Sequence, residues 1–172
     1  MALVNATGQS VYRFLKAMVR DDDIAQDLTQ DTYLRAFQSL GSFRGEARLT
    51  TWILAIARNL ALNRVRRITL ERRWHVDTGT PPDVPDERPA PEHEDERRLM
   101  AALGELSPRL REAVVLYYVE GLGIDEVAQL TRRPANTIKS DLHRARAALR
   151  IALGVPGGPP TPGPRQTETN DE

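Results

Sequence analysis

Apolar residues recur at helical spacing along most of the 172-residue chain, and nowhere does the pattern require a strand. The stretch 123–149 predicts a short helix, a tight turn and a longer basic helix. One face of the longer helix, residues 136–150, is apolar at Ile138, Leu142, Ala145 and Leu149. Its other positions are polar or charged: Thr137, Lys139, Ser140, Asp141, His143, Arg144 and Arg146. A helix built in this way can dock in a major groove, so the stretch predicts a helix-turn-helix motif.

Three further helices are predicted in the N-terminal part of the chain. Residues 9–19 place apolar side chains at i, i+3, i+4 and i+7, namely Val11, Phe14, Leu15 and Met18. Aspartates at 21–23 suit an N-cap and first helical turn, where carboxylates accept backbone N–H bonds. The next helices are expected over residues 23–40 and, after a polar glycine-punctuated loop at 41–51, over residues 51–67.

The helix at 23–40 has two distinct faces. One is the expected buried stripe: Ala25, Leu28, Thr32, Tyr33, Ala36 and Leu40. The other is mostly polar: Asp27, Gln30, Asp31, Leu34, Arg35 and Gln38. An exposed leucine between acids, an amide and an arginine is what a partner-binding surface would show. A simply solvated face is the alternative, and periodicity alone leaves both interpretations open.

The helix at 51–67 is the strongest in the N-terminal half. Its core face carries Trp52, Ile53, Ile56, Ala57 and Leu60. Its polar face carries Arg58, Asn59, Asn63, Arg64, Arg66 and Arg67. Arginines and asparagines along a helix fit contact with nucleic acid. The alternative is that the arginines only keep the helix soluble. Trp52 lies on the apolar stripe and is expected in the core more than as a base-stacking platform.

Proline and glycine content divides the chain. Residues 77–92 hold five prolines and no apolar periodicity, which is typical of a linker. Helix resumes near residue 94, Ser107 and Pro108 provide an N-cap and first helical position, and Gly121 suits the end of that helix. The expected fold is all-α: a helical domain at 1–74, a flexible acidic linker at 75–93, a second helical domain at 94–153 and a disordered tail at 154–172.

Charge is balanced overall but unevenly distributed. The formal net charge is zero, from 24 basic and 24 acidic residues. Residues 58–73 hold six arginines and one acid, whereas residues 77–96 hold eight acids and one arginine. Such blocks indicate a polyanion-binding surface beside a solvated linker. Two tethered helical domains, each with a basic helix, would read a bipartite DNA sequence.

The sequence offers no chemistry of its own. It has no cysteine, and its histidines at 75, 93 and 143 lack metal-ligand spacing. Asp27 and Asp31 have no neighbouring base or pocket, so they are expected to form a charged face and not a catalytic pair. We therefore predict no catalytic residue, metal or cofactor. With no apolar run near the roughly 18 residues of a membrane span and no signal peptide, a cytoplasmic protein without membrane insertion is expected.

Two blocks, in order and spacing, resemble a known family. They are DDDIAQDLTQDTYLRAFQSLGSFRGEARLTTWILAIARNLALNRVRR (21–67) and LSPRLREAVVLYYVEGLGIDEVAQLTRRPANTIKSDLHRARAAL (106–149). Together they resemble region 2 and region 4 of the extracytoplasmic-function (ECF) group of sigma-70 family bacterial sigma factors. The resemblance covers roughly residues 9–151. It implies a protein that directs core RNA polymerase to promoters, controlled by an anti-sigma factor.

The resemblance also assigns roles to residues. The β′ coiled coil of core polymerase would bind Asp27, Gln30, Asp31, Leu34 and Arg35, and the β flap would be a second contact on the polymerase. Loop 41–51 and the following helix would hold the unpaired −10 strand through Arg44, Arg48, Trp52, Arg58, Asn59, Asn63, Arg64, Arg66 and Arg67. Helix 136–150 would read the −35 duplex. Its phosphate contacts would be Lys139, Arg144 and Arg146, and its base contacts Ser140, Asp141 and His143, with Thr137 beside them.

The chain departs from the family pattern at several points. Its first helix is expected to be shortened, because only about eight residues precede the first periodic segment. Gly123 stands where relatives often place a capping serine. Arg132 and Asn136 occupy turn positions that are commonly glycine, and asparagine tolerates positive φ better than arginine. Asp141 stands where an arginine is frequent. Because an acid can accept from cytosine N4, we expect Asp141 to shift the −35 preference without abolishing binding.

Two other classes of protein would share part of this sequence. A stand-alone helix-turn-helix regulator would have a similar C-terminal half, but should show a ligand pocket or phosphoacceptor site within 21–67. A decoy partner for an anti-sigma factor would not need the arginines at 58, 64, 66 and 67. Addition of the chain to sigma-free core polymerase separates all three classes.

Overall fold

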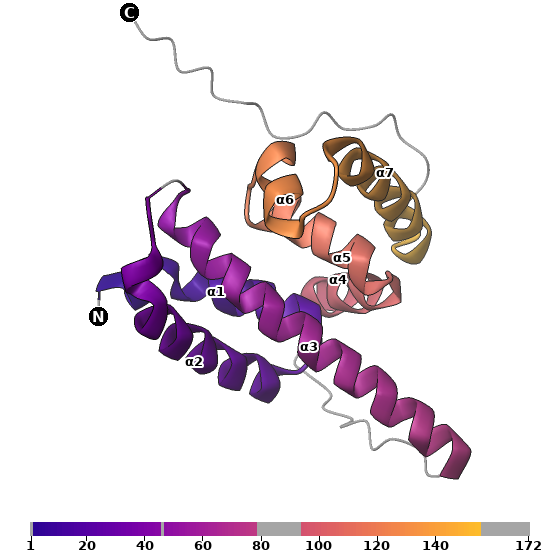
Figure 1. Cartoon of the computed structure of the whole chain (residues 1–172). Coiled ribbons are helices and arrows are strands. Elements are labelled where there is room, and N and C mark those ends of the chain that lie inside the picture. The colour runs from indigo at the N-terminus through magenta and orange to yellow at the C-terminus, as the bar shows by residue number, and fades with distance from the viewer. Residues whose placement is uncertain (1, 46, 79–93, 156–172) are drawn as a thin grey trace, which may run out of the picture.

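The computed structural model describes residues 2–45, 47–78 and 94–155, and every regular element among them is helical (Figure 1). The N-terminal half consists of α1 (Ala2–Val19), α2 (Asp22–Ser39), the 3-10 turn η1 (Leu40–Ser42) and α3 (Leu49–Thr78). The C-terminal half consists of α4 (Glu94–Glu105), α5 (Pro108–Val114), the π turn η3 (Val115–Val119), α6 (Ile124–Thr131) and α7 (Ala135–Ala152). The all-α prediction is confirmed. Most of the expected linker and tail, 79–93 and 156–172, lies outside the described residues.

Helix α1 is the centre of the N-terminal half and packs against both α2 and α3. The side chains predicted from its spacing are fully buried: Val11, Phe14, Leu15 and Met18. Helix α3 meets them with Ile53, Leu54, Ala57 and Ala61. Burial of each large aliphatic or aromatic side chain stabilises the fold by about 1.5–3 kcal/mol, so this three-helix core is the main source of stability here.

The first helix begins at Ala2 and not near residue 9, so the predicted start of this helix is wrong. Thr7 is buried, and its hydroxyl shares a hydrogen bond of 2.7 Å with the hydroxyl of Tyr33 on α2. Val4 packs against the core one turn earlier. Because a threonine and Gly8 interrupt the apolar spacing, periodicity alone does not reveal these turns.

Helix α2 starts as predicted, since the Asp21 carboxylate accepts a hydrogen bond of 2.8 Å from the Ile24 N–H. Its buried residues are Ala25, Thr32, Tyr33 and Ala36. Leu28 is half-buried, and Leu40, predicted in the same stripe, is 44% exposed. The helix ends at Ser39, and the turn that follows carries Leu40 away from the core.

Helix α3 is longer than the predicted 51–67. It runs from Leu49 to Thr78, past the expected domain boundary at 74, and its C-terminal end projects beyond α1 and α2 (Figure 1). Local interactions favour the extension. Arg67 pairs with Glu71 one turn later at 3.3 Å, and helix-breaking prolines begin only at 81.

In the C-terminal half, the helix start predicted at Ser107 and the glycine predicted after the helix end, Gly121, are both confirmed. Ser107 accepts from the Leu110 N–H as N-cap of α5, and Gly121 has a φ of 68°. Gly123 is the N-cap of α6, where the Glu126 carboxylate accepts a hydrogen bond of 2.8 Å from its N–H. Arg132 ends α6 in the left-handed region at a φ of 55°, a position that glycine adopts at lower cost. Asn136, expected in the turn, instead lies in the first turn of α7.

The two halves pack against each other. One continuous apolar core joins Met18 of α1 and Ala57 of α3 to Leu103 of α4 and Val115 of η3. Helices α1 and α3 contact α5, η3 and α6 of the C-terminal half. In the described residues, the region 2–like and region 4–like halves therefore share one apolar core.

Candidate nucleic-acid and polymerase interfaces

Helix α7 presents the predicted recognition face. Ile138, Leu142 and Ala145 are buried against α5 and α6, and Leu149 is half-buried. Four of the predicted DNA-contact residues are exposed: Lys139, Ser140, His143 and Arg144. Thr137 and Arg146 are half-buried at the margins of this face. The helix thus has a solvated side with hydroxyl, imidazole, ammonium and guanidinium groups that suits base edges and phosphates.

Asp141 does not belong to this face, and its assignment as a base contact is wrong for this structure. The residue is 1% exposed. Its Oδ2 accepts hydrogen bonds of 2.9 Å from Arg109 on α5 and 2.8 Å from Arg133 in the turn before α7. A carboxylate held by two guanidinium groups inside the fold cannot reach cytosine N4. It positions the recognition helix instead.

The same network extends to the N-terminal half. Arg133 Nη2 donates to Glu112 Oε2 at 2.7 Å, and Arg58 Nε donates to Glu112 Oε1 at 2.5 Å. Positive and negative groups alternate through five side chains, which we call the charge network: Arg109, Asp141, Arg133, Glu112 and Arg58. Burial lowers the pKa of the Arg133 guanidinium, and the two carboxylates oppose that effect. The network links the recognition helix to α3.

The residues predicted to hold the −10 strand divide into two groups. Arg44, Arg48, Asn59, Asn63, Arg66 and Arg67 are exposed. Trp52 is half-buried and stacks obliquely on Phe43, with ring centroids 5.3 Å apart, so it is neither fully core nor freely exposed. Arg58 faces Glu112, and the half-buried Arg64 has a buried Nε with no hydrogen-bond partner among the described residues.

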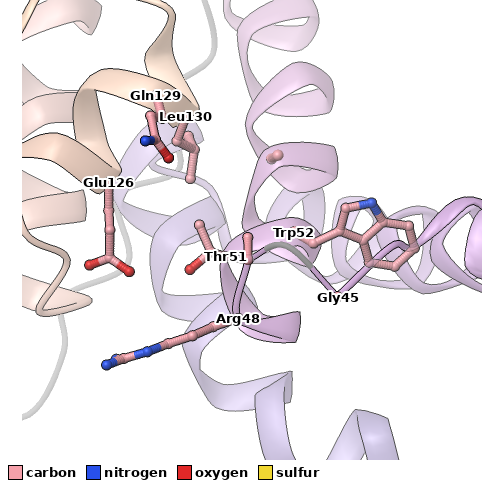
Figure 2. A pocket seen from close by; sticks show the side chains of 9 residues that line it. Gly45, Arg48, Thr51, Trp52, Glu126, Gln129 and Leu130 are labelled. Carbon is pink, nitrogen blue, oxygen red and sulfur yellow. The ribbon is translucent and has the colours of Figure 1, made fainter.

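A cleft of about 690 Å³ lies between the start of α3 and α6. Figure 2 shows Glu126, Gln129 and Leu130 of α6 on one side, and on the other Arg48, which precedes α3, and Thr51 of α3. The wall on the α3 side comes from residues predicted to bind the −10 strand. In this conformation the first helix of the helix-turn-helix motif therefore faces that part of the predicted DNA surface.

The polar face of α2 is fully open to solvent. Asp27, Gln30, Asp31 and Arg35 are exposed, and Leu34 is 60% exposed. Phe37, which the sequence analysis did not single out, is 51% exposed on the edge of the same face. The sequence does contain a signal for Phe37, because it lies three residues after Leu34 and residues at that spacing are neighbours on a helix surface. Exposed apolar side chains ringed by charge are typical of a protein–protein contact.

Arg111 has a structural role that the sequence pattern does not reveal. It is buried and donates to four backbone carbonyl oxygens: Leu103 at 2.8 Å, Met18 at 2.9 Å, Gly104 at 3.0 Å and Leu106 at 3.0 Å. Burial lowers the pKa of its guanidinium, and the charge of Arg20 adds to this effect. It holds the α4–α5 turn and ties it to the C-terminal end of α1.

Glu120 joins η3 to α1 and makes stability depend on pH. Its carboxylate accepts from the Ser10 hydroxyl and lies 3.8 Å from Arg13. Burial raises the pKa of this carboxyl, and both partners oppose the shift. Burying the ionised form therefore costs stability, and this cost is absent below the unfolded-state pKa. We expect Glu120→Gln to raise the urea midpoint at pH 7 relative to the wild type, and the difference to vanish as the pH falls below about 4. An equal difference at both pH values would contradict this.

Among the described residues, no group of three or more histidine, aspartate or glutamate side chains is placed to hold a metal ion. Within the same part of the chain, no helix is long and apolar enough to cross a membrane. A helix-turn-helix with a basic solvated face, beside a helical half with an exposed partner-type face and a basic helix, defines a DNA-binding transcription protein with a protein partner.

Comparison with known proteins agrees with this class. The family model of sigma-70 region 2 matches residues 3–70, and that of sigma-70 region 4 matches residues 96–149. The ECF RNA polymerase sigma factor SigX of Bacillus subtilis is 33% identical over 150 residues, which cover 83% of this chain and 77% of SigX. The ECF RNA polymerase sigma factor SigC of Mycobacterium tuberculosis is 34% identical over 150 residues, covering 86% and 80%.

A solved structure is also similar over most of the chain. The sigma factor RpoE of Bartonella quintana, in complex with the anti-sigma factor NepR, superposes with a TM-score of 0.76 at 27% identity. The match covers 90% of this chain and 96% of RpoE. The chain belongs to the ECF group of the sigma-70 family. It is a sigma factor that directs promoter-specific transcription by RNA polymerase, and the stand-alone regulator is not favoured.

Proposed function

We propose that three exposed faces of this chain carry out the three binding functions of a sigma factor, to core polymerase, to the −10 strand and to the −35 duplex. The polar face of α2 binds the β′ coiled coil of core polymerase. The segment before α3, with Arg44 and Arg48, and the first part of α3, with Trp52, Asn59 and Asn63, hold the unpaired −10 strand, and Arg66 and Arg67 follow its phosphates. The solvated face of α7 reads the −35 duplex through Ser140 and His143, with Lys139 and Arg144 on phosphates.

The observation that carries this proposal is the combination of a solvated α7 face with an exposed leucine-centred face on α2. DNA binding alone would need only the solvated α7 face. The exposed leucine-centred face on α2 fits a protein partner that a stand-alone regulator lacks. The protein makes and breaks no bonds itself, acts in the cytoplasm, and is restrained by an anti-sigma factor that covers some of these faces. The similar sigma factor RpoE, which was solved in complex with the anti-sigma factor NepR, supports such a partner.

The test is reconstitution with sigma-free core RNA polymerase. Promoters are first selected from a randomised DNA library with the mixture of chain and core. The selected DNA should then form open complexes, detected by permanganate reactivity of unpaired thymines, only when both components are present. Specific duplex binding by the chain alone, without opening, would support a regulator instead.

Leu34→Arg should weaken binding to core polymerase by at least about 30-fold, the equivalent of the 2 kcal/mol that marks an interface hot spot. The side chain is 60% exposed, so folding should not change. Leu70→Arg is the matched control, since Leu70 is 55% exposed on α3, outside the α2 face. Fluorescence anisotropy with labelled chain measures both. Equal affinities for core of the two variants would exclude the α2 face as the docking surface.

A further inference from the structure

Arg109 differs from the other members of the charge network in its exposure to solvent. Its side chain is 56% exposed, whereas those of Arg133 and Arg58 are 15% and 16% exposed. The two carboxylates, of Asp141 and Glu112, are almost fully buried. Three guanidinium groups and two carboxylates give the network one net positive charge. Because burial of an uncompensated charge is costly, this excess charge resides on Arg109, the member that faces solvent.

The Arg109 guanidinium uses only part of its hydrogen-bonding capacity within the chain. Its Nε donates to the Asp141 Oδ2 at 2.9 Å. Among the described residues, none accepts a hydrogen bond from its Nη1 or Nη2 atom. These two nitrogens carry most of the N–H donors of a guanidinium. An anion that approaches from solvent can therefore be bound without loss of the hydrogen bond to Asp141.

Both the backbone and the side chain of Arg109 are fixed to the recognition helix and to the turn before it. The Arg109 carbonyl oxygen accepts a hydrogen bond of 3.4 Å from Arg133 Nη1, which also donates to Asp141 at 2.8 Å. Helix α5, on which Arg109 lies, packs against α7. Much of the freedom of this long side chain is thus lost on folding and need not be lost again when a ligand binds.

The position of Arg109 places its Nη atoms at the edge of the proposed −35 interface. Asp141 directly follows Ser140, a proposed base contact, and lies three residues before Arg144, a proposed phosphate contact. Residues three apart are neighbours on a helix surface, so the guanidinium bound to Asp141 lies on the Arg144 side of α7. A helix with its side chains is about 10–12 Å across, and the major groove is about 12 Å wide. A charged group beside the helix therefore meets the sugar–phosphate backbone and not the base edges.

We propose that Arg109 of α5 is a phosphate contact for the −35 duplex, and that the buried Asp141 carboxylate is the positioning residue that aims it. The inference rests on the proposed function, because it uses the same docking of α7 in the major groove. Nε stays on Asp141 while the Nη atoms donate to a phosphate on the Arg144 side of the groove. One guanidinium then makes charge-assisted hydrogen bonds to two anions at once. Asp141 thereby contributes to DNA binding without touching DNA.

A phosphate contact outside the recognition helix fixes the register of that helix and carries no sequence information. Loss of Arg109 should therefore weaken binding to different −35 sequences by a similar factor. The −35 sequence selected from a randomised library should stay the same. Arg133, which binds the same carboxylate, is mostly buried and serves the fold. The two guanidinium groups on Asp141 thus have different tasks.

Neutral phosphates test the contact directly. Promoter fragments selected by the wild-type chain with core polymerase are prepared with one methylphosphonate at each phosphate of the −35 element in turn, and their affinities for chain with core are measured. At one phosphate on the Arg144 side, we expect the neutral group to weaken wild-type binding about 10-fold, the effect of one hydrogen bond to a charged group. Arg109→Gln should weaken binding to the natural fragment by a similar factor and show no further loss at that phosphate.

Arg97→Gln is the matched control. It removes the same charge from the surface of α4, where Arg97 pairs with Glu94, and it should keep the wild-type sensitivity at every phosphate. Wild-type sensitivity at every phosphate in Arg109→Gln would overturn the contact and leave the sigma function intact. A wild-type chain that opens no selected promoter with core would contradict the proposed function, and the Arg109 contact with it.

A second variant separates DNA contact from folding. Arg109→Lys keeps a positive charge beside Asp141, which also retains Arg133, so its urea midpoint should stay near that of the wild type. Because one ammonium does not span a carboxylate and a phosphate as a planar guanidinium does, the sensitivity at the Arg109 phosphate should still be lost. Wild-type sensitivity in Arg109→Lys would show that charge alone suffices, and would overturn the aiming of the guanidinium by Asp141.

Discussion

Replacing Asp141 by arginine should unfold the C-terminal half of the chain and not redirect its DNA preference. The substitution removes the carboxylate that Arg109 and Arg133 share and places a third guanidinium at a site that is 1% exposed. Breaking a buried ion pair costs about 3–5 kcal/mol, a large part of the stability of a small domain. Urea denaturation monitored by circular dichroism should show the loss.

His143→Arg is the matched control, because it adds the same side chain to an exposed position of α7. It should leave stability within about 0.5 kcal/mol of the wild type. Asp141→Asn keeps the shape of the side chain without its charge, so its stability should lie between those of Asp141→Arg and His143→Arg. If Asp141→Arg were as stable as the wild type and altered −35 selection from a randomised library, the assignment of Asp141 as a base contact would be right.

Arg111→Met should destabilise the whole chain by about 3–5 kcal/mol. Methionine fills similar volume but removes the side-chain donor from four backbone carbonyl oxygens in α1, α4 and the α4–α5 turn, of which, among the described residues, only that of Leu103 keeps a second donor, the Leu106 N–H. Each unpaired buried polar group costs about 1–3 kcal/mol, partly relieved by relaxation. Arg111→Lys should recover only part of the loss, because a single ammonium cannot reach the points that a planar guanidinium spans.

Arg97→Met is the control that separates the loss of the Arg111 carbonyl contacts from the loss of any arginine. Arg97 is on the surface of α4 and pairs with Glu94, and surface pairs contribute at most about 1 kcal/mol. Its urea midpoint should stay near that of the wild type. Similar midpoints for the Arg111 and Arg97 variants would show that the four carbonyl contacts carry little stability.

Periodicity predicted the α2 and α7 faces because a helix of 3.6 residues per turn assigns sides to residues before any tertiary contact forms. Ile138, Leu142 and Ala145 are buried as predicted, and Leu34 is exposed as predicted. Asp141 could have been recognised too. It follows Ile138 by three residues and precedes Ala145 by four, which places it on the apolar side. Because aspartate is polar, Asp141 was assigned to the solvated face together with the other polar residues.

Other features had no counterpart in local sequence. Arg58 lies on a basic helix and reads as a DNA contact, and only the approach of α5 brings Glu112 to it. Arg111 is one of many arginines until the α4–α5 turn closes around it. Thr7 and Gly8 interrupt an apolar pattern that α1 nevertheless continues, because Tyr33 of another helix satisfies the threonine hydroxyl.

The sequence by itself therefore determined the helices, their caps, their solvated faces and the family, since all of these depend on spacing within about twenty residues or on motif order. Only the tertiary structure decided which charges are paired inside the fold. Whether an arginine or aspartate meets DNA or a buried partner depends on side chains that lie from eight to more than fifty residues away along the chain. Spacing carries no information about those pairings, and one of them, Arg58 with Glu112, joins the two halves.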